Sequence, residues 1–161
     1  MRYLFLFFLP FILSCGQNKV KEVAAGGVKT KPIPGVTPSM IHDNFTKKGF
    51  KLDTTMDGDI SVWTSTENNE MHEFKVTTSS TNTNHVISIQ ASVVSMLTLD
   101  QAARDFIGQV ASVQYKYADP QKAKDWVMAN LEKGGTTTIG DVTFQVIVNN
   151  ETSRAFKIYI Q

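Results

Sequence analysis

Apolar side chains recur at every second position in two parts of this chain, and this period constrains the fold more than any other feature. It is clearest in residues 142–148 and 156–160. Successive side chains of a β-strand point to opposite faces, so a period of two predicts strands with one buried face. A three-residue loop at 150–152 would pair Val146 with Phe156. The chain is therefore predicted to close with an antiparallel hairpin.

Four further strands are predicted upstream, joined by short polar turns. The first lies around Phe50 and Leu52, and the others cover residues 60–66, 71–78 and 85–95. Such a succession of strands is typical of an antiparallel sheet. The signals that separate the strands are Asp57-Gly58, the polar residues 67–70 and the polar loop 79–84.

Pairing the strands across these turns gathers the large apolar side chains on one face of the sheet. Trp63 is placed opposite Leu52 in the first pairing and opposite Phe74 in the second. The third pairing places Phe74 opposite Ile89. A one-residue slip would scatter these side chains over both faces, so the pattern supports the pairing. The other face is mostly polar, and we expect it to be open to solvent.

Three helices are predicted from capping residues and apolar stripes. Thr37-Pro38 and Asp119-Pro120 each combine an N-cap residue with a proline suited to the first turn. Thr98–Gln101 has the form of a capping box and predicts the start of the second helix. The predicted fold is α+β, an antiparallel sheet of about five to six strands with helices packed on one face, in the order α-β-β-β-β-α-α-β-β.

The first residues of the chain have the layout of a bacterial export signal. Arg2 supplies a positive charge, and residues 3–13 form an apolar run that is shorter than the roughly 20 residues needed to span a bilayer. The end of this run, Ile12-Leu13-Ser14-Cys15-Gly16, resembles the lipobox of bacterial lipoproteins. The resemblance implies cleavage before Cys15, a diacylglycerol on its sulfur, and an acyl chain such as palmitate on its amine. These lipids would hold the chain to a membrane.

The same resemblance gives an expected location and a division of the chain. We expect a lipoprotein signal peptide over residues 1–14, a lipid-anchored flexible linker over 15–36 and a single α+β domain over 37–161. In lipoproteins of some bacteria, an aspartate after the cysteine often marks retention at the inner membrane. Gly16 stands there in this chain, which favours the outer membrane if the cell has one, and the cell membrane otherwise.

Charge is distributed unevenly along the mature chain. Without Arg2 there are 15 basic and 15 acidic side chains, and this balance argues against nucleic acid as a partner. A basic segment beside a lipid anchor can add attraction to anionic head groups, and a plain solvated linker is the alternative. The expected linker holds one acidic residue, Glu22, against four lysines: Lys19, Lys21, Lys29 and Lys31.

Inspection of the sequence finds no catalytic, cofactor or metal motif. Cys15 is the single cysteine, so its lipidation would leave no thiol for catalysis and no intrachain disulfide. His72-Glu73 opens like the H-E-x-x-H zinc motif, but the fifth position is Val76 and the segment is predicted as a strand. We therefore expect surface or capping roles for the histidines, no cofactor, no metal and no enzymatic activity.

We expect a non-enzymatic cell-envelope lipoprotein that acts by protein–protein interaction, as accessory, inhibitor and immunity-type proteins do. Its predicted architecture is broadly similar to small α+β domains of envelope lipoproteins and of some inhibitors of secreted enzymes. A small-ligand or envelope-polymer binding module is the alternative, and an enzyme with dispersed catalytic residues is a third possibility. The expected interaction face consists of polar side chains on the open side of the sheet: Lys75, Gln90, Gln145, Lys157 and Tyr159.

Overall fold

Seven antiparallel strands and three helices make up the computed structural model, which describes residues 31–81 and 85–161. The helices are α1 (Pro38–Thr46), α2 (Gln101–Ala111) and α3 (Pro120–Asn130). The strands are β1 (Lys51–Asp57), β2 (Ile60–Asn68), β3 (His72–Thr81), β4 (His85–Ser95), β5 (Gly135–Ile139), β6 (Val142–Asn150) and β7 (Ser153–Tyr159). The α+β class is confirmed, whereas Cys15 and the predicted signal lie outside the described residues.

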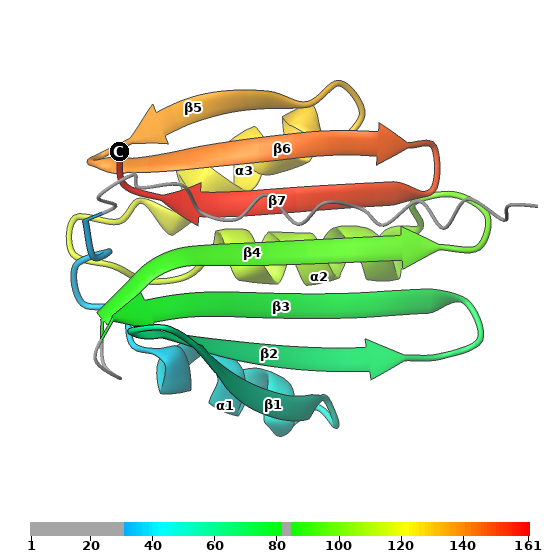
Figure 1. The fold of residues 1–161 in the computed structure, drawn as a ribbon. Coiled ribbons are helices and arrows are strands. Elements are labelled where there is room, and N and C mark those ends of the chain that lie inside the picture. The colour runs from blue at the N-terminus through cyan, green and yellow to red at the C-terminus, as the bar shows by residue number, and fades with distance from the viewer. Residues whose placement is uncertain (1–30, 82–84) are drawn as a thin grey trace, which may run out of the picture.

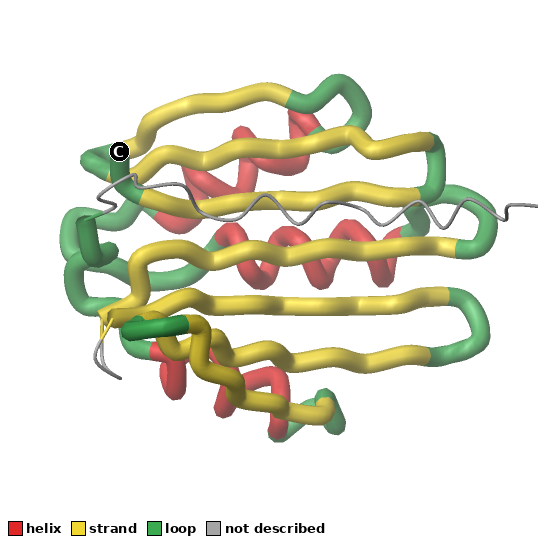
Figure 2. The backbone as a smooth tube through the Cα atoms, viewed as in Figure 1, coloured by secondary structure: helices red, strands yellow, loops and turns green. Residues whose placement is uncertain are grey.

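The helices lie on one face of a single sheet, as Figure 1 shows. The strand order is β1-β2-β3-β4-β7-β6-β5. α1 packs against β1, β2 and β3, α2 against β3 and β4, and α3 against β5 and β6. Two meanders, β1–β4 and β5–β7, meet where β4 pairs with β7 in the middle of the sheet (Figure 2). The helix-free face, which is turned toward the viewer in Figure 1, is called the open face below.

The predicted count of five to six strands is wrong, because residues 135–139 form the additional edge strand β5. Their sequence, Gly-Thr-Thr-Thr-Ile, contains a single large apolar residue and therefore shows no period of two. β5 pairs with β6 along its whole length and is covered in part by α3. β-branched threonines suit a pleated, half-buried edge, so the strand forms without an apolar pattern.

Two of the three predicted helix starts are confirmed. The side chains of Thr37 and Asp119 accept backbone N–H groups in the first turns of α1 and α3. The predicted capping box at Thr98 is wrong, because Asp100 caps α2 instead and accepts a backbone N–H at 3.0 Å. A carboxylate at this position also interacts favourably with the positive end of the helix dipole.

The predicted faces of the β-strands are correct except at the start of β4, where alternation from Ile89 predicts Ile87 on the covered face and a β-bulge puts Val86 there instead. The predicted register of the first three pairings is wrong. Trp63 lies opposite Thr78 rather than Phe74, and Phe74 lies opposite Val93 rather than Ile89. In each pairing the observed register differs from the predicted one by an even number of residues. An even shift leaves every side chain on its predicted face, which is why the apolar side chains still meet the helices.

The shifts arise at the turns and at hydroxyl-rich strand ends. The β1–β2 turn consists of Gly58 and Asp59, and β3 continues through residues 79–81, which were expected to form a loop. Thr78 and Ser80 are fully buried in the described structure. Because both side chains are polar, a search for alternating apolar residues does not detect this part of the strand. The sequence therefore underestimates the lengths of β2 and β3.

β1 is exposed along its whole length and forms the opposite edge of the sheet. Leu52 lies opposite Ser65 rather than Trp63, and it is 41% exposed. Trp63 itself is half-buried beside α1, where its ring lies 6.0 Å from that of His42. The first strand thus contributes less to the core than its predicted pairing requires.

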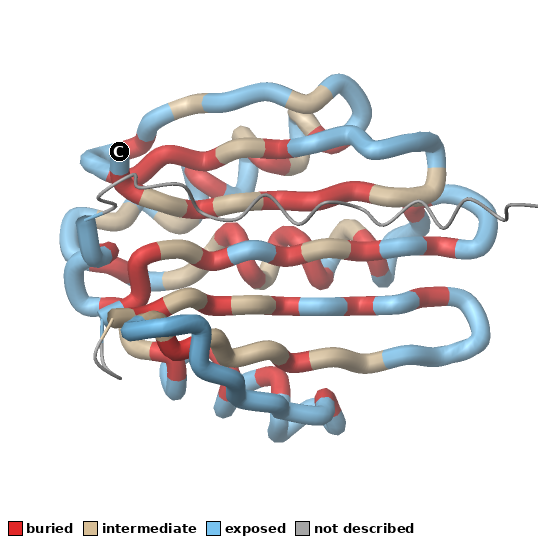
Figure 3. Tube along the Cα trace, viewed as in Figure 1, coloured by how far each residue is buried: buried red, intermediate tan, exposed pale blue. Residues whose placement is uncertain are grey.

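The core lies between the sheet and the helices, as the buried segments in Figure 3 show. The C-terminal hairpin has the predicted register, with Val146 opposite Phe156. At the other side of the core, Phe106 of α2 contacts Phe45 and Phe74, with ring centroids 5.7 Å and 4.9 Å apart. This aromatic packing joins α2 to both α1 and the sheet.

The folded part begins before residue 37. Ile33 and Val36 are each 1% exposed and belong to the core. The Ile33 N–H donates to the Val86 carbonyl at 2.7 Å, and Lys31 forms a β-bridge with Ile160 at the end of β7. Residues 31–36, which were expected in the linker, are therefore part of the fold.

Candidate interaction surface

The open face carries the residues that alternate with the core positions along each strand. Because neighbouring strands are in register, these side chains form rows across the sheet. The central row, from β1 to β5, is Asp53, Thr64, Thr77, Gln90, Lys157, Gln145 and Thr136. The next row is Thr55, Val62, Ser79, Ser88, Tyr159, Thr143 and Thr138. Hydroxyl and amide groups therefore dominate this surface.

Four of the five predicted interaction residues come together at the centre of the open face. Lys157 lies opposite Gln90 on one side and opposite Gln145 on the other. Tyr159 follows on the same face of β7, and the Lys157 Nζ lies 5.4 Å from the centroid of its ring. Lys75 lies on the same face of β3, one row away. An ammonium group, two amides and a phenol thus share one patch.

The five predicted residues differ in exposure, and the two charged side chains among them, Lys75 and Lys157, are both cationic. Lys75 and Gln90 are exposed, whereas Gln145, Lys157 and Tyr159 are half-buried. The cations of the patch face neutral hydroxyl and amide neighbours in their own rows. The arrangement offers hydrogen-bond donors and acceptors on a rigid sheet, together with a modest positive charge. Groups of this kind can bind a partner through hydrogen bonds and charge.

His42 has a structural role that sequence reasoning missed. Its side chain is fully buried, with Nδ1 2.7 Å from the Ser65 Oγ and Nε2 2.9 Å from the Thr78 Oγ1. Burial lowers the pKa of His42 from 6.5 to about 4, and the carboxylate of Asp43 opposes that change. The expectation of a surface or capping role is therefore wrong for this histidine. Its isolation from solvent leaves it no access to a substrate.

The other two histidines lie at opposite ends of the β3–β4 hairpin, as predicted. His85 is exposed and pairs with Thr81 at one end, whereas His72 pairs with Ser95 at the other. The His72 Nε2 lies 3.0 Å from the Asp100 Oδ1, and its ring stacks on a core phenylalanine. The pKa of Asp100 is held below its usual range, mainly because it accepts the backbone N–H of the helix cap. This pair fixes the start of α2 against the sheet.

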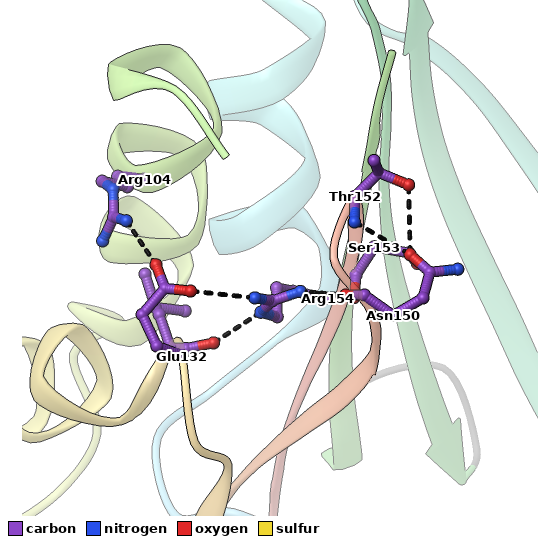
Figure 4. A network of polar contacts seen from close by, with 7 residues as sticks. Arg104, Glu132, Asn150, Thr152, Ser153 and Arg154 are labelled. Atoms are coloured by element: carbon purple, nitrogen blue, oxygen red, sulfur yellow. Dashed lines mark hydrogen bonds and ion pairs between the residues drawn. The ribbon is translucent and has the colours of Figure 1, made fainter. Parts of the chain in front are cut away.

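A buried arginine joins the C-terminal hairpin to the helices, as Figure 4 shows. Arg154 is 3% exposed and donates to the backbone carbonyls of Leu131 and Asn150. Its guanidinium also donates to Glu132 at 3.0 Å, and Glu132 accepts from Arg104 at 2.5 Å. These hydrogen bonds, that from Arg104 first, hold the pKa of Glu132 below its usual range against the opposing effect of burial.

The guanidinium of Arg154 donates its hydrogen bonds to groups of the protein itself. We therefore interpret this network as a structural contact between the hairpin and the helices, and not as an anion-binding site. Its members come from four places in the fold: α2, the residues directly after α3, the end of β6, and β7. No local spacing in the sequence connects them. Tertiary structure alone reveals the network, which explains why sequence reasoning did not find it.

A hollow of about 570 Å³ lies between α3 and the edge strand β5. Trp126 lines it on the helix side and Thr137 on the strand side. Asp119 and Asp125 add carboxylates at its rim. The combination of an aromatic ring with polar groups suits a hydroxylated ligand.

Among residues 31–81 and 85–161, no group of three or more His, Cys, Asp and Glu side chains is placed to hold a metal ion. No helix in the described part of the chain is both long and apolar enough to cross a membrane. No family model, curated protein or solved structure matches this chain. The support for the candidate surface is therefore the geometry of the open face.

Proposed function

We propose that this chain is a non-enzymatic lipoprotein of the bacterial cell envelope that binds a protein partner through its open face. The segment Ile12–Gly16, which resembles a lipobox, supports a lipid anchor at Cys15. The row Gln90–Lys157–Gln145, with Tyr159 beside it, is the observation that carries the binding part of the proposal. Gly16 after the cysteine favours the outer membrane where the cell has one.

The chemistry of the patch suits a protein surface better than a small molecule. Tyrosine offers an apolar ring and a polar tip, and lysine offers an apolar stem and a charged end. Tyrosine is also enriched at protein interfaces. The side chains project from the central strands of a sheet, where the backbone is held on both sides, so little further ordering of the backbone is needed on binding. A polar or mildly acidic partner surface would complement the two lysines.

The lipid anchor is tested by labelling the chain in cells with radioactive palmitate. The wild-type chain should incorporate label, and Cys15→Ser should incorporate none and accumulate as uncleaved precursor or unanchored protein. Equal labelling of the two chains would overturn the anchor. Gln17→Ser, which lies outside Ile12–Gly16 and retains the cysteine, is the matched control and should still be labelled.

The open face is tested with a partner captured by chemical cross-linking on intact cells. Lys75→Glu combined with Lys157→Glu should weaken binding of that partner by about tenfold or more, as loss of central interface contacts does. The matched control reverses two exposed lysines on the helix side, Lys47→Glu with Lys122→Glu, and should leave binding unchanged. Equal affinity of the open-face variant and the wild type would overturn the proposal.

A second candidate function is the binding of an envelope polymer in the hollow between α3 and β5. The half-buried ring of Trp126 beside Asp119 and Asp125 favours it, because sugar rings stack on aromatic side chains while their hydroxyls bind carboxylates. Pull-down with purified cell-wall glycan should then retain the wild-type chain but not Trp126→Ala. Equal retention of both chains would remove this candidate.

A further inference from the structure

A second hollow, at one end of the sheet, combines exposed apolar side chains with carboxylates. There the β2–β3 loop lies beside the chain leaving β4, and the Met96 N–H donates to the Met71 carbonyl at 3.0 Å. The hollow has a volume of about 280 Å³ and is lined by residues 68–73 and 94–96. We call it the loop-edge hollow. It lies at the opposite end of β7 from the bridge between Lys31 and Ile160.

The apolar part of the loop-edge hollow is unusually exposed. Met96 is 72% exposed and its neighbour Leu97 is 71% exposed. Met71 and Val94 add side chains that are 44% and 45% exposed. Large apolar side chains scattered singly over a surface are ordinary, but three that line one hollow, Met71, Val94 and Met96, indicate a contact site.

The polar part of the hollow indicates the chemistry of its occupant. Glu70 and Glu73 line it, and its lining contains no lysine or arginine. Ser95 also lines it and is 4% exposed, yet its Oγ makes no hydrogen bond within the described structure. A buried hydroxyl without a partner is uncommon in folded proteins, and this one lies at the wall of the hollow. The hollow therefore fits a segment that combines cationic and apolar side chains.

We propose that Lys19–Val23 of this chain docks in the loop-edge hollow. This segment, Lys-Val-Lys-Glu-Val, places two lysines and two valines within five residues. The lysines complement Glu70 and Glu73, and the valines complement the exposed methionines. Charge complementarity of this kind fixes which segment binds and in which register.

Chain length selects Lys19–Val23 over the other lysines of the linker. Lys31 is held beside Ile160, and β7 extends from there toward the hollow for about 23 Å at about 3.3 Å per residue. Val23 is eight residues before Lys31 and reaches about 26–29 Å when extended. Lys29 reaches only about 7 Å and cannot arrive. The segment that begins at Lys19 can therefore span the sheet, whereas the lysine nearest the fold cannot.

Docking of Lys19–Val23 does not depend on lipidation or on the proposed partner. Its direct path from Lys31 crosses the open face, because the helices cover the other face. A docked segment would therefore compete with a partner on that face. The experiments remain separable, since the palmitate label and the Lys75 and Lys157 variants report on the proposed function alone.

The test uses the whole chain as the cell processes it, with benzoylphenylalanine introduced in place of Leu97. Illumination should cross-link Leu97→benzoylphenylalanine to residues 19–23 of the same molecule, as mapped by mass spectrometry at monomer mass. The same photoreactive residue at Met56 of β1, which is 66% exposed and lies near the opposite end of the strands from the hollow, should give no such product. Products limited to a second copy, another protein or lipid, or no product at all, would overturn the proposal.

Charge reversal provides an independent test. Lys19→Glu with Lys21→Glu should reduce the intramolecular product by about fivefold or more, since it replaces attraction by repulsion. This variant changes residues outside the described core, so the domain should fold as before. Adding Glu70→Lys with Glu73→Lys should restore the product. The matched control, Asp53→Lys with Asp57→Lys on β1, should change nothing, and an unaltered yield in the first variant would contradict the docking.

Discussion

Lowering the pH from 7 to 5 should destabilise this protein by about 2 kcal/mol through His42. The imidazole is fully buried, and both of its nitrogens are within hydrogen-bond distance of hydroxyl groups, those of Ser65 and Thr78. A protonated ring would lose its hydration there without gaining a carboxylate in hydrogen-bond contact. This loss lowers the pKa of His42 from 6.5 to about 4, with partial opposition from Asp43.

The direction of the effect follows from proton binding. Below pH 6.5 the unfolded chain binds a proton at His42 that the folded chain does not bind until about pH 4. The stability contribution is therefore complete above pH 6.5 and is lost as the pH falls toward 4. Each pKa unit corresponds to about 1.4 kcal/mol, so the whole window is worth about 3 kcal/mol. About 2 kcal/mol of it falls between pH 7 and pH 5.

Urea unfolding followed by tryptophan fluorescence at both pH values measures this effect. The free energy of unfolding should fall by about 2 kcal/mol more in the wild type than in His42→Asn, which cannot titrate. The comparison concerns the change with pH, so a lower stability of His42→Asn at pH 7 does not affect it. His85→Asn, at an exposed position, should keep the wild-type change. Equal changes in the wild type and His42→Asn would refute the reasoning, as would an imidazole pKa at or above 6.5 by NMR.

Three further predictions test the packing by urea unfolding. Phe144→Ala, at a fully buried site, should cost about 3–5 kcal/mol and the half-buried Trp63→Ala clearly less; equal costs would contradict the observed register. Arg154→Met should cost about 3 kcal/mol, because the buried Leu131 carbonyl and the part-buried Asn150 carbonyl both lose their donor; a loss below about 1 kcal/mol would refute the stabilising role of Arg154. Asp100→Ala should cost about 1–2 kcal/mol, and Asp100→Asn, which retains a capping side chain, should recover most of that loss.

The sequence predicts the parts of this fold that depend on local chemistry. The caps at Thr37 and Asp119 follow from the short reach of an N-cap side chain, and the C-terminal hairpin follows from a short loop between two strongly apolar strands. The placement of Lys157 between Gln90 and Gln145 also follows, because strand alternation decides which face a side chain occupies. Each of these features is determined within a few residues.

Features that depend on tertiary contacts could not be predicted in this way. β5 has no apolar period, because a partner strand on one side and α3 are enough to hold its threonines. Arg154 and Glu132 are 22 residues apart in the chain and meet only when the hairpin packs beneath the end of α3. The loop-edge hollow likewise arises from two segments, 68–73 and 94–96, whose sequences give no sign that they are neighbours.

The register of the first meander shows why a correct apolar pattern still left the pairing undecided. Moving a strand by two residues keeps every apolar side chain on the covered face, so burial alone barely distinguishes such alternatives. His42 does distinguish them, because Ser65 of β2 and Thr78 of β3 must both reach the same imidazole. A two-residue slip toward the predicted pairing would put Val76 where Thr78 stands and leave a buried ring nitrogen without a partner, at a cost of about 1–3 kcal/mol. The buried histidine thus selects one pairing among several of similar hydrophobic energy, and the sensitivity to acid predicted above is the consequence of that role.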